Sequence, residues 1–300
     1  MNSTHAHILL VAFAVCFVSL AGAEESHLDR PDVLGTDWSR GWFEPPVHCH
    51  FSPRGTPLIH PFHVEPAFAQ RDLLVDYSFG AGTDEDEHEI EVELEWALSR
   101  RLALVVEVPY HFLNPADGRA EDGLGDLAFA PRALLAEYQR FLLAFGLEIE
   151  TSTGDEDRGL GRGEAAVAPS FSFWCDLGHW WVLNAQVGTE HATDSGDAEL
   201  LFRASLIHTL GYQEVQGSAH ADHDHEHDHG LPPGLLSLIL EVDGTLGLAG
   251  DEDGDIEAEG IIGAYYGLSE HMDLRAGYRF PLTRSQELNS GLTAGAIWHF

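Results

Sequence analysis

Apolar and polar residues alternate along several segments of the chain, most clearly over residues 89–98, EIEVELEWAL. Apolar side chains occupy every second position from Ile90 to Leu98, and glutamates occupy most of the positions between them. Successive side chains of a β-strand point to opposite faces, whereas a helix of this sequence would scatter its glutamates over the surface. The segment is therefore predicted to be a strand with one apolar and one acidic face.

The same alternation predicts twelve strands. They span residues 71–79, 89–98, 102–110, 126–137, 141–151, 164–175, 180–190, 198–210, 235–245, 256–268, 272–281 and 288–300. Short turns and longer acidic loops alternate between them, an asymmetry typical of bacterial outer-membrane barrels, which have an even number of strands. We predict an all-β fold, a transmembrane antiparallel up-and-down β-barrel of about 12 strands over residues 64–300.

A β-sandwich is the alternative fold, because it also produces alternating segments. Charged residues recur on the polar face, however, while the other face stays apolar over whole strands. A barrel in lipid turns its apolar face outward and pairs every strand edge. The polar face would then line the lumen, either as a salt-bridged filling or as a channel that attracts cations. The predicted lumen-lining residues are Glu91, Glu93, Glu95, Glu107, Glu148, Glu150, Arg132, Arg203, Arg275 and Arg279.

The last predicted strand ends on an aromatic residue. Phe300, Trp298 and every second residue back to Leu292 form an apolar face. This pattern resembles the closing strand of bacterial outer-membrane barrels, and Phe300 and Trp298 would form the C-terminal barrel signature. A location in the outer membrane follows as an expectation, with outer-membrane lipid and the barrel assembly machinery as partners.

The first residues resemble a secretory signal peptide. The continuous apolar run from Ile8 to Leu20 is followed by Ala21-Gly22-Ala23, a cleavage site of small residues. We expect residues 1–23 to be removed on export and residues 24–63, with their Pro, Gly, Trp and His, to form an irregular periplasmic segment. No later stretch is apolar for long enough to predict a transmembrane helix.

The charge of the chain excludes several functions. Acidic residues number 50 against 15 basic ones, so the net charge is −35, and every basic residue is Arg. Such a chain is not expected to bind nucleic acid, which requires cationic side chains against phosphate. His191, Asp194 and Ser195 are the best candidates for a catalytic triad, but they share one short loop, and no Gly-x-Ser-x-Gly motif is present. We therefore expect no catalytic residues and no enzyme.

A His-rich run, HADHDHEHDH, occupies residues 220–229 within a longer loop over residues 213–233. Imidazoles and carboxylates together can bind Zn, Ni or Cu, and no other cofactor is predicted. No spacing selects one coordination geometry, so a solvated low-complexity loop is the other interpretation. A smaller candidate for soft metals is His48-Cys49-His50, with His60 and His63 nearby. The candidate ligands in the run are His220, His223, His225, His227, His229, Asp222, Asp224 and Asp228.

Four segments resemble one known family. They are residues 56–79 (TPLIHPFHVEPAFAQRDLLVDYSF), 96–104 (WALSRRLAL), 123–135 (GLGDLAFAPRALL) and 266–274 (YGLSEHMDL). These segments resemble the outer-membrane family named for the phenol meta-degradation pathway, over residues 56–300. The resemblance implies an exported barrel with a role in the passage of small, including aromatic, molecules.

The sequence thus predicts transporter- or porin-like passage of small solutes through an acidic lumen, the solutes being aromatic or hydrophobic compounds or cations. The alternative is an envelope protein that binds Zn, Ni or Cu through its His-rich loop, with the barrel as an anchor.

Overall fold

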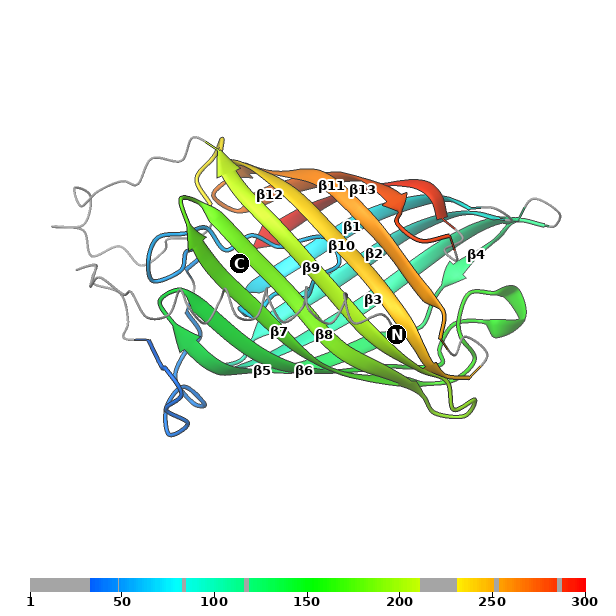
Figure 1. The fold of residues 1–300 in the computed structure, drawn as a ribbon, viewed down its shortest axis with the longest axis horizontal. Coiled ribbons are helices and arrows are strands. Elements are labelled where there is room, and N and C mark those ends of the chain that lie inside the picture. Colours follow the sequence, from blue (N-terminus) through cyan, green and yellow to red (C-terminus); the bar gives the residue numbers. More distant parts are fainter. Residues whose placement is uncertain are drawn as a thin grey trace, which may run out of the picture.

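The computed structural model is a closed antiparallel β-barrel (Figure 1). It describes residues 33–47, 49–82, 85–115, 119–210, 231–250, 254–284 and 288–300. The sheet closes because β1 pairs with both β2 and β13, while β2 also pairs with β3. Its strands are β1 (Arg71–Gly82), β2 (Glu85–Ala97), β3 (Leu102–Pro115), β4 (Glu121–Leu124), β5 (Ala128–Tyr138), β6 (Phe141–Glu150), β7 (Ala166–Gly178), β8 (Trp181–Ala192), β9 (Ala198–Leu210), β10 (Leu236–Ala249), β11 (Ile256–Ser269), β12 (Met272–Pro281) and β13 (Leu288–His299).

Strands β4 and β5 act as one interrupted strand. The short β4 pairs with the second half of β3, over Tyr110–Leu113, while β5 pairs with its first half, over Leu102–Glu107. The barrel therefore has twelve strand positions, and the predicted all-β antiparallel barrel of about 12 strands is confirmed. At the interruption, Asp126 accepts hydrogen bonds from the backbone N–H groups of Gly154 and Arg162. It thereby ties down the loop that carries the 3₁₀ turn Glu156–Arg158.

Apolar side chains cover the outside of the barrel. On β2, Val92 and Trp96 are exposed, whereas Glu93 and Glu95 between them are buried on the inner side. On β13, Leu292 and Trp298 are exposed, as is Phe300 directly after it. An outward apolar face with buried charges behind it is the arrangement that a lipid environment favours. No helix in the described ranges is long and apolar enough to cross a membrane.

The two ends of the barrel differ. The strand pairs β2–β3, β5–β6, β7–β8 and β11–β12 are joined by short connections at one end, here called the turn end. The start of β1 and the end of β13 also lie there, because Asp72 pairs with His299. The connection between β9 and β10 leaves from the same end, and its His-rich residues 220–229 lie outside the described residues. The opposite end is called the loop end.

One predicted loop was too long. Residues 80–88 were expected to form an acidic loop, but β1 continues to Gly82 and β2 begins at Glu85. The cross-strand register runs on through Gly80 and Glu87, and β3 continues the pairing of β2 as far as Pro115. Backbone hydrogen bonding to two neighbours therefore outweighs the low β-propensity of the acidic residues.

The segment before β1 lies inside the barrel. Residues 56–70, here called the plug, run irregularly through the turn-end half of the lumen (Figure 1). Their apolar side chains form one buried core with inward residues of the wall. Its members include Leu58, Ile59, Phe62, Phe68, Leu74, Trp174, Ile207, Ile239, Ile261, Tyr265 and Ile297. Residues 24–63 were expected to be irregular and outside the barrel, and entry into the lumen was not anticipated. Among its charged residues, the inward face of the wall carries apolar ones at this depth, such as Trp174, Ile239 and Ile261, so it offers the plug a place to bury hydrophobic surface.

Candidate functional site

The backbone of the plug is held by charged side chains of the wall. Glu241, fully buried on β10, accepts hydrogen bonds from three consecutive N–H groups, those of Phe62 (2.9 Å), His63 (2.6 Å) and Val64 (2.9 Å). An irregular backbone inside a barrel has no sheet partner, and its unpaired N–H groups would be costly to bury. One carboxylate therefore satisfies three consecutive backbone N–H groups of the plug.

Three inward arginines bind the plug carbonyls. Arg275 of β12 donates to the carbonyl of Pro61, and Arg203 of β9 donates to that of His63 at 3.2 Å. Arg132 of β5 lies 3.4 Å from the carbonyl of Phe68. Each also pairs with a carboxylate, Arg275 with Asp76, Arg203 with Asp243, and Arg132 with Glu65 and Glu95. The arginines expected to line the lumen thus connect the plug to widely separated strands.

The ring of Phe62 lies on a flat part of the wall made by two glycines. Gly263 of β11 and Gly277 of β12 are register partners, and a Cβ at either position would come within 2.6 and 3.0 Å of that ring. Arg275 lies 5.8 Å above the ring centroid, within the range of a cation–π contact. The absence of side chains at these two positions lets the plug approach the sheet closely.

His63 lies on the side of the plug that faces the loop end. Its Nδ1 lies 2.9 Å from Asp243 and 3.3 Å from Glu259, and these carboxylates also bind Arg203 and Arg279, respectively. Burial alone would lower the pKa of His63, but the hydrogen bond to Asp243 and the charges of Asp243, Glu241 and Glu259 raise it above 6.5. His63 is therefore a cationic link between plug and wall at mildly acidic pH.

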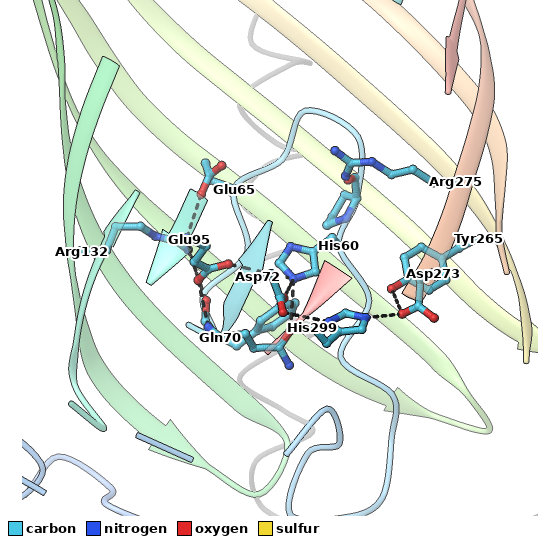
Figure 2. Close-up of polar contacts among 12 residues, drawn as sticks. His60, Glu65, Gln70, Asp72, Glu95, Arg132, Tyr265, Asp273, Arg275 and His299 are labelled. Carbon is cyan, nitrogen blue, oxygen red and sulfur yellow. Dashed lines mark hydrogen bonds and ion pairs between the residues drawn. The ribbon is translucent and has the colours of Figure 1, made fainter. Parts of the chain in front are cut away.

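A second polar network lies deeper, near the turn end (Figure 2). Asp72 is fully buried, and its carboxylate oxygens lie 3.0 Å from His60 Nε2 and 2.8 Å from His299 Nδ1. The other ring nitrogen of His299 lies 2.7 Å from Asp273, which also accepts a hydrogen bond from Tyr265. Asp72, Asp273 and His299 were not predicted as site residues from the sequence. Their signal was a polar residue at an inward position near the turn-end terminus of a predicted strand.

The loop-end half of the lumen is hollow. A cavity of about 610 Å³ lies on the loop-end side of His63, which forms part of its lining. A second cavity of about 350 Å³ adjoins the first, because Glu87 and Glu89 line both. Together they are called the chamber here. The smaller cavity is strongly acidic, its ionisable lining being Glu87, Glu89, Glu91, Glu107, His111, Asp126, Glu148, Glu150 and Arg162.

The residues predicted to line the lumen divide between these regions. Glu91, Glu107, Glu148 and Glu150 line the smaller cavity, and Arg279 lines the larger one. Glu95 accepts a hydrogen bond from the backbone of Gln70 at the end of the plug, while Glu93 is buried between the two regions. Of the smaller metal candidate, His50 lies against His299 with ring centroids 4.2 Å apart, and His48 lies outside the described residues.

The three residues considered as a triad have other partners. His191 Nε2 lies 3.0 Å from the hydroxyl of Thr189. The backbone N–H groups of Asp194 and Ser195 both donate to the carboxylate of Glu164. The contacts of Asp194 and Ser195 with Glu164 stabilise the loop between β8 and β9.

No protein-family model matches the chain, and no curated protein matches it. Among solved structures, the COG4313 outer membrane channel from Pseudomonas putida F1 is similar, with a TM-score of 0.59 at 14% identity, covering 81% of this chain and 100% of that one. The NanC porin gives 0.48 at 8% identity, covering 76% and 99%, respectively. At 14% identity the similarity to the channel shows the fold alone: this chain has the fold of outer-membrane β-barrels.

Proposed function

We propose that this protein is an outer-membrane channel for small solutes, with an acidic chamber at the loop end and a plug that closes the turn end. The observation that carries the proposal is the division of one closed lumen into a hollow half and a filled half. The similarity in fold to an outer-membrane channel supports it. The finer resemblance, to the phenol meta-degradation family, belongs to this proposal and adds aromatic compounds to the candidate solutes.

The chamber favours cationic solutes over the other classes. Seven carboxylates line its smaller cavity against one Arg and one His. Field lines concentrate in a cleft lined by one sign of charge, which raises the local concentration of ions of opposite charge. The apolar side chains that line the two cavities include Leu113 and Leu288 in the larger one and Leu160 in the smaller one.

Passage through the barrel requires the plug to move. Its contacts with the wall described above are hydrogen bonds, ion pairs and apolar packing, all of which can break reversibly. We therefore propose a channel with two populations, a closed one with the plug in place and a rarer open one. The orientation that suits this function places the turn end, with the plug, in the periplasm.

Solute uptake into liposomes tests the proposal. Arginine, glutamine and glutamate have similar sizes and different charges, so their rates of entry report on charge rather than on bore. We expect arginine to enter fastest and glutamate slowest, and Glu148→Gln with Glu150→Gln to reduce that difference. Equal rates for arginine and glutamate, or rates no higher than in empty liposomes, would refute the proposal.

A further inference from the structure

Three oxygen atoms converge on one ring nitrogen near the turn end (Figure 2). His60 Nε2 lies 3.0 Å from Asp72 Oδ2, 3.1 Å from Gln70 Oε1 and 4.0 Å from Glu95 Oε2. All four residues are buried, and Asp72 and Glu95 are fully so. A ring nitrogen carries at most one proton, so it can donate to only one of these acceptors well.

Glu95 is a buried carboxylate whose hydrogen bonding is incomplete. Its Oε1 accepts a hydrogen bond from the backbone of Gln70 and lies 3.4 Å from Arg132, but its Oε2 is buried without a hydrogen-bond partner. A buried carboxylate oxygen without a partner is costly, because it has lost its hydration and gained nothing in return. The free oxygen is directed at the ring nitrogen of His60, at a distance too long for a hydrogen bond.

The local charge is also unbalanced. Two carboxylates, Glu65 and Glu95, share the single guanidinium of Arg132, at 2.9 and 3.4 Å, while the third carboxylate, Asp72, lies beside His60. His299 lies between Asp72 and Asp273. Its two ring nitrogens therefore face these carboxylates and do not supply a partner for Glu95. A cation held by His60, Asp72 and Glu95 would supply the missing charge and a partner for each oxygen.

We propose that His60, Asp72 and Glu95, with the side-chain carbonyl of Gln70, form a binding site for a divalent first-row transition-metal ion. The ligand atoms of the first three lie within 4.8 Å of one another, which is the span of a single coordination sphere. One imidazole, two carboxylates and a carbonyl suit an ion such as Zn²⁺ rather than Cu⁺, which prefers sulfur. The site is distinct from the His-rich run.

The surroundings already hold the ligands in place. The ring of Phe68 meets the ring of His60 edge-on at 5.1 Å, which fixes its orientation. Asp72 is positioned through its other oxygen by His299, which is in turn held by Asp273. Hydrogen-bonded partners behind metal ligands typically raise affinity by fixing ligand orientation.

The site would join two parts of the molecule. His60 and Gln70 belong to the plug, whereas Asp72 belongs to β1 and Glu95 to β2. A bound ion would therefore tie the plug to the wall where it leads into the first strand. This role does not depend on conduction, and binding can be measured even if the barrel passes no solute.

Zinc binding to the refolded full chain in detergent tests the site. The His-rich run could bind zinc itself and hide the signal of this site. All chains in the experiment, called the background, therefore carry Asn in place of His220, His223, His225, His227 and His229. We expect this background to bind one Zn²⁺ per chain in calorimetric titration. Glu95→Gln and His60→Gln should each lower the affinity by about tenfold or more. The matched control is Glu137→Gln, a turn-end carboxylate that pairs with Arg100 away from the site.

The spectrum of bound Co²⁺ identifies the ligands independently. The expected spectrum shows d–d bands without a thiolate charge-transfer band, because no cysteine is among the proposed ligands. A thiolate band would assign the metal to a cysteine, Cys49 or Cys175, and overturn the proposal. Stoichiometric binding that persists in both Glu95→Gln and His60→Gln, equal losses in Glu137→Gln, or no zinc binding by the folded background would also overturn it.

Discussion

Glu241 is the residue on which the position of the plug depends most. It is fully buried and accepts three backbone N–H groups of the plug, and each hydrogen bond to a charged acceptor contributes about 1.5–3 kcal/mol. A glutamine there keeps the shape but replaces one acceptor oxygen with a donor that faces N–H groups. A single isosteric change should therefore loosen the plug without disturbing the outer surface of the barrel.

We predict that Glu241→Gln opens the channel more often than the wild type. A loss of about 2 kcal/mol in plug binding would raise the open population more than tenfold. Single-channel recording measures the open fraction directly. The control is Glu164→Gln, whose carboxylate also accepts two backbone N–H groups but lies in a loop away from the plug. An open fraction that does not change in Glu241→Gln would show that this carboxylate does not hold the plug.

His63 should make the closed state dependent on pH. Its raised pKa means that protonated His63 stabilises the folded, plugged form. That stabilisation is complete below its ordinary pKa of 6.5 and is lost as pH rises through the raised value. The groups facing it are Asp243 and Glu241 from β10, Glu259 from β11, Arg203 from β9 and Arg279 from β12.

The open fraction is therefore expected to increase from pH 6 to pH 9. His63→Gln should weaken this increase, because glutamine carries no proton to lose over that range. The same recordings at several pH values measure both chains. An equally steep pH dependence in His63→Gln would assign the effect to another group.

Strand β2 carries the clearest test of which face meets lipid. Trp96 and Val92 are exposed on its outer face, and Glu93 is 8% exposed on its inner face, opposite Glu107 in the register. Leu94 lies on the outer face between them. An Arg at the middle of a lipid-facing strand costs about 2–4 kcal/mol, whereas neutralising a glutamate beside another glutamate removes repulsion.

Leu94→Arg should consequently destabilise the barrel more than Glu93→Gln does. Urea unfolding in lipid vesicles gives the free energy of unfolding for both variants and for the wild type. If Glu93→Gln loses as much stability as Leu94→Arg, the apolar face of β2 is not in lipid.

The strands could be predicted because lipid outside and charge inside impose a period of two on the whole wall. The segment EIEVELEWAL in β2 needed no other information. The plug could not be predicted in this way. Its backbone has no period, and its partner Glu241 lies 179 positions from Phe62 in the sequence. The buried network of Asp72, His299 and Asp273 was missed because each residue alone looks like any other inward polar position.

At the scale of the whole molecule, the chain distributes its charge unevenly. Arg132, Arg203 and Arg275 contact plug carbonyls and pair with carboxylates, while the smaller cavity of the chamber has seven carboxylates against one Arg and one His. Part of the net charge of −35 therefore lies at the smaller cavity, where it would attract cations. A cation that enters the chamber would meet a favourable electrostatic potential, and the plug would block its way to the turn end.

The reversal potential in a potassium chloride gradient tests the proposed channel most directly. Wild type and Glu241→Gln are inserted into planar bilayers, and single-channel currents are recorded with unequal salt on the two sides. We predict small, infrequent, cation-selective openings for the wild type and more frequent openings with the same selectivity for Glu241→Gln. Anion selectivity, or the absence of any conductance in both chains, would contradict the account of an acidic channel closed by its plug.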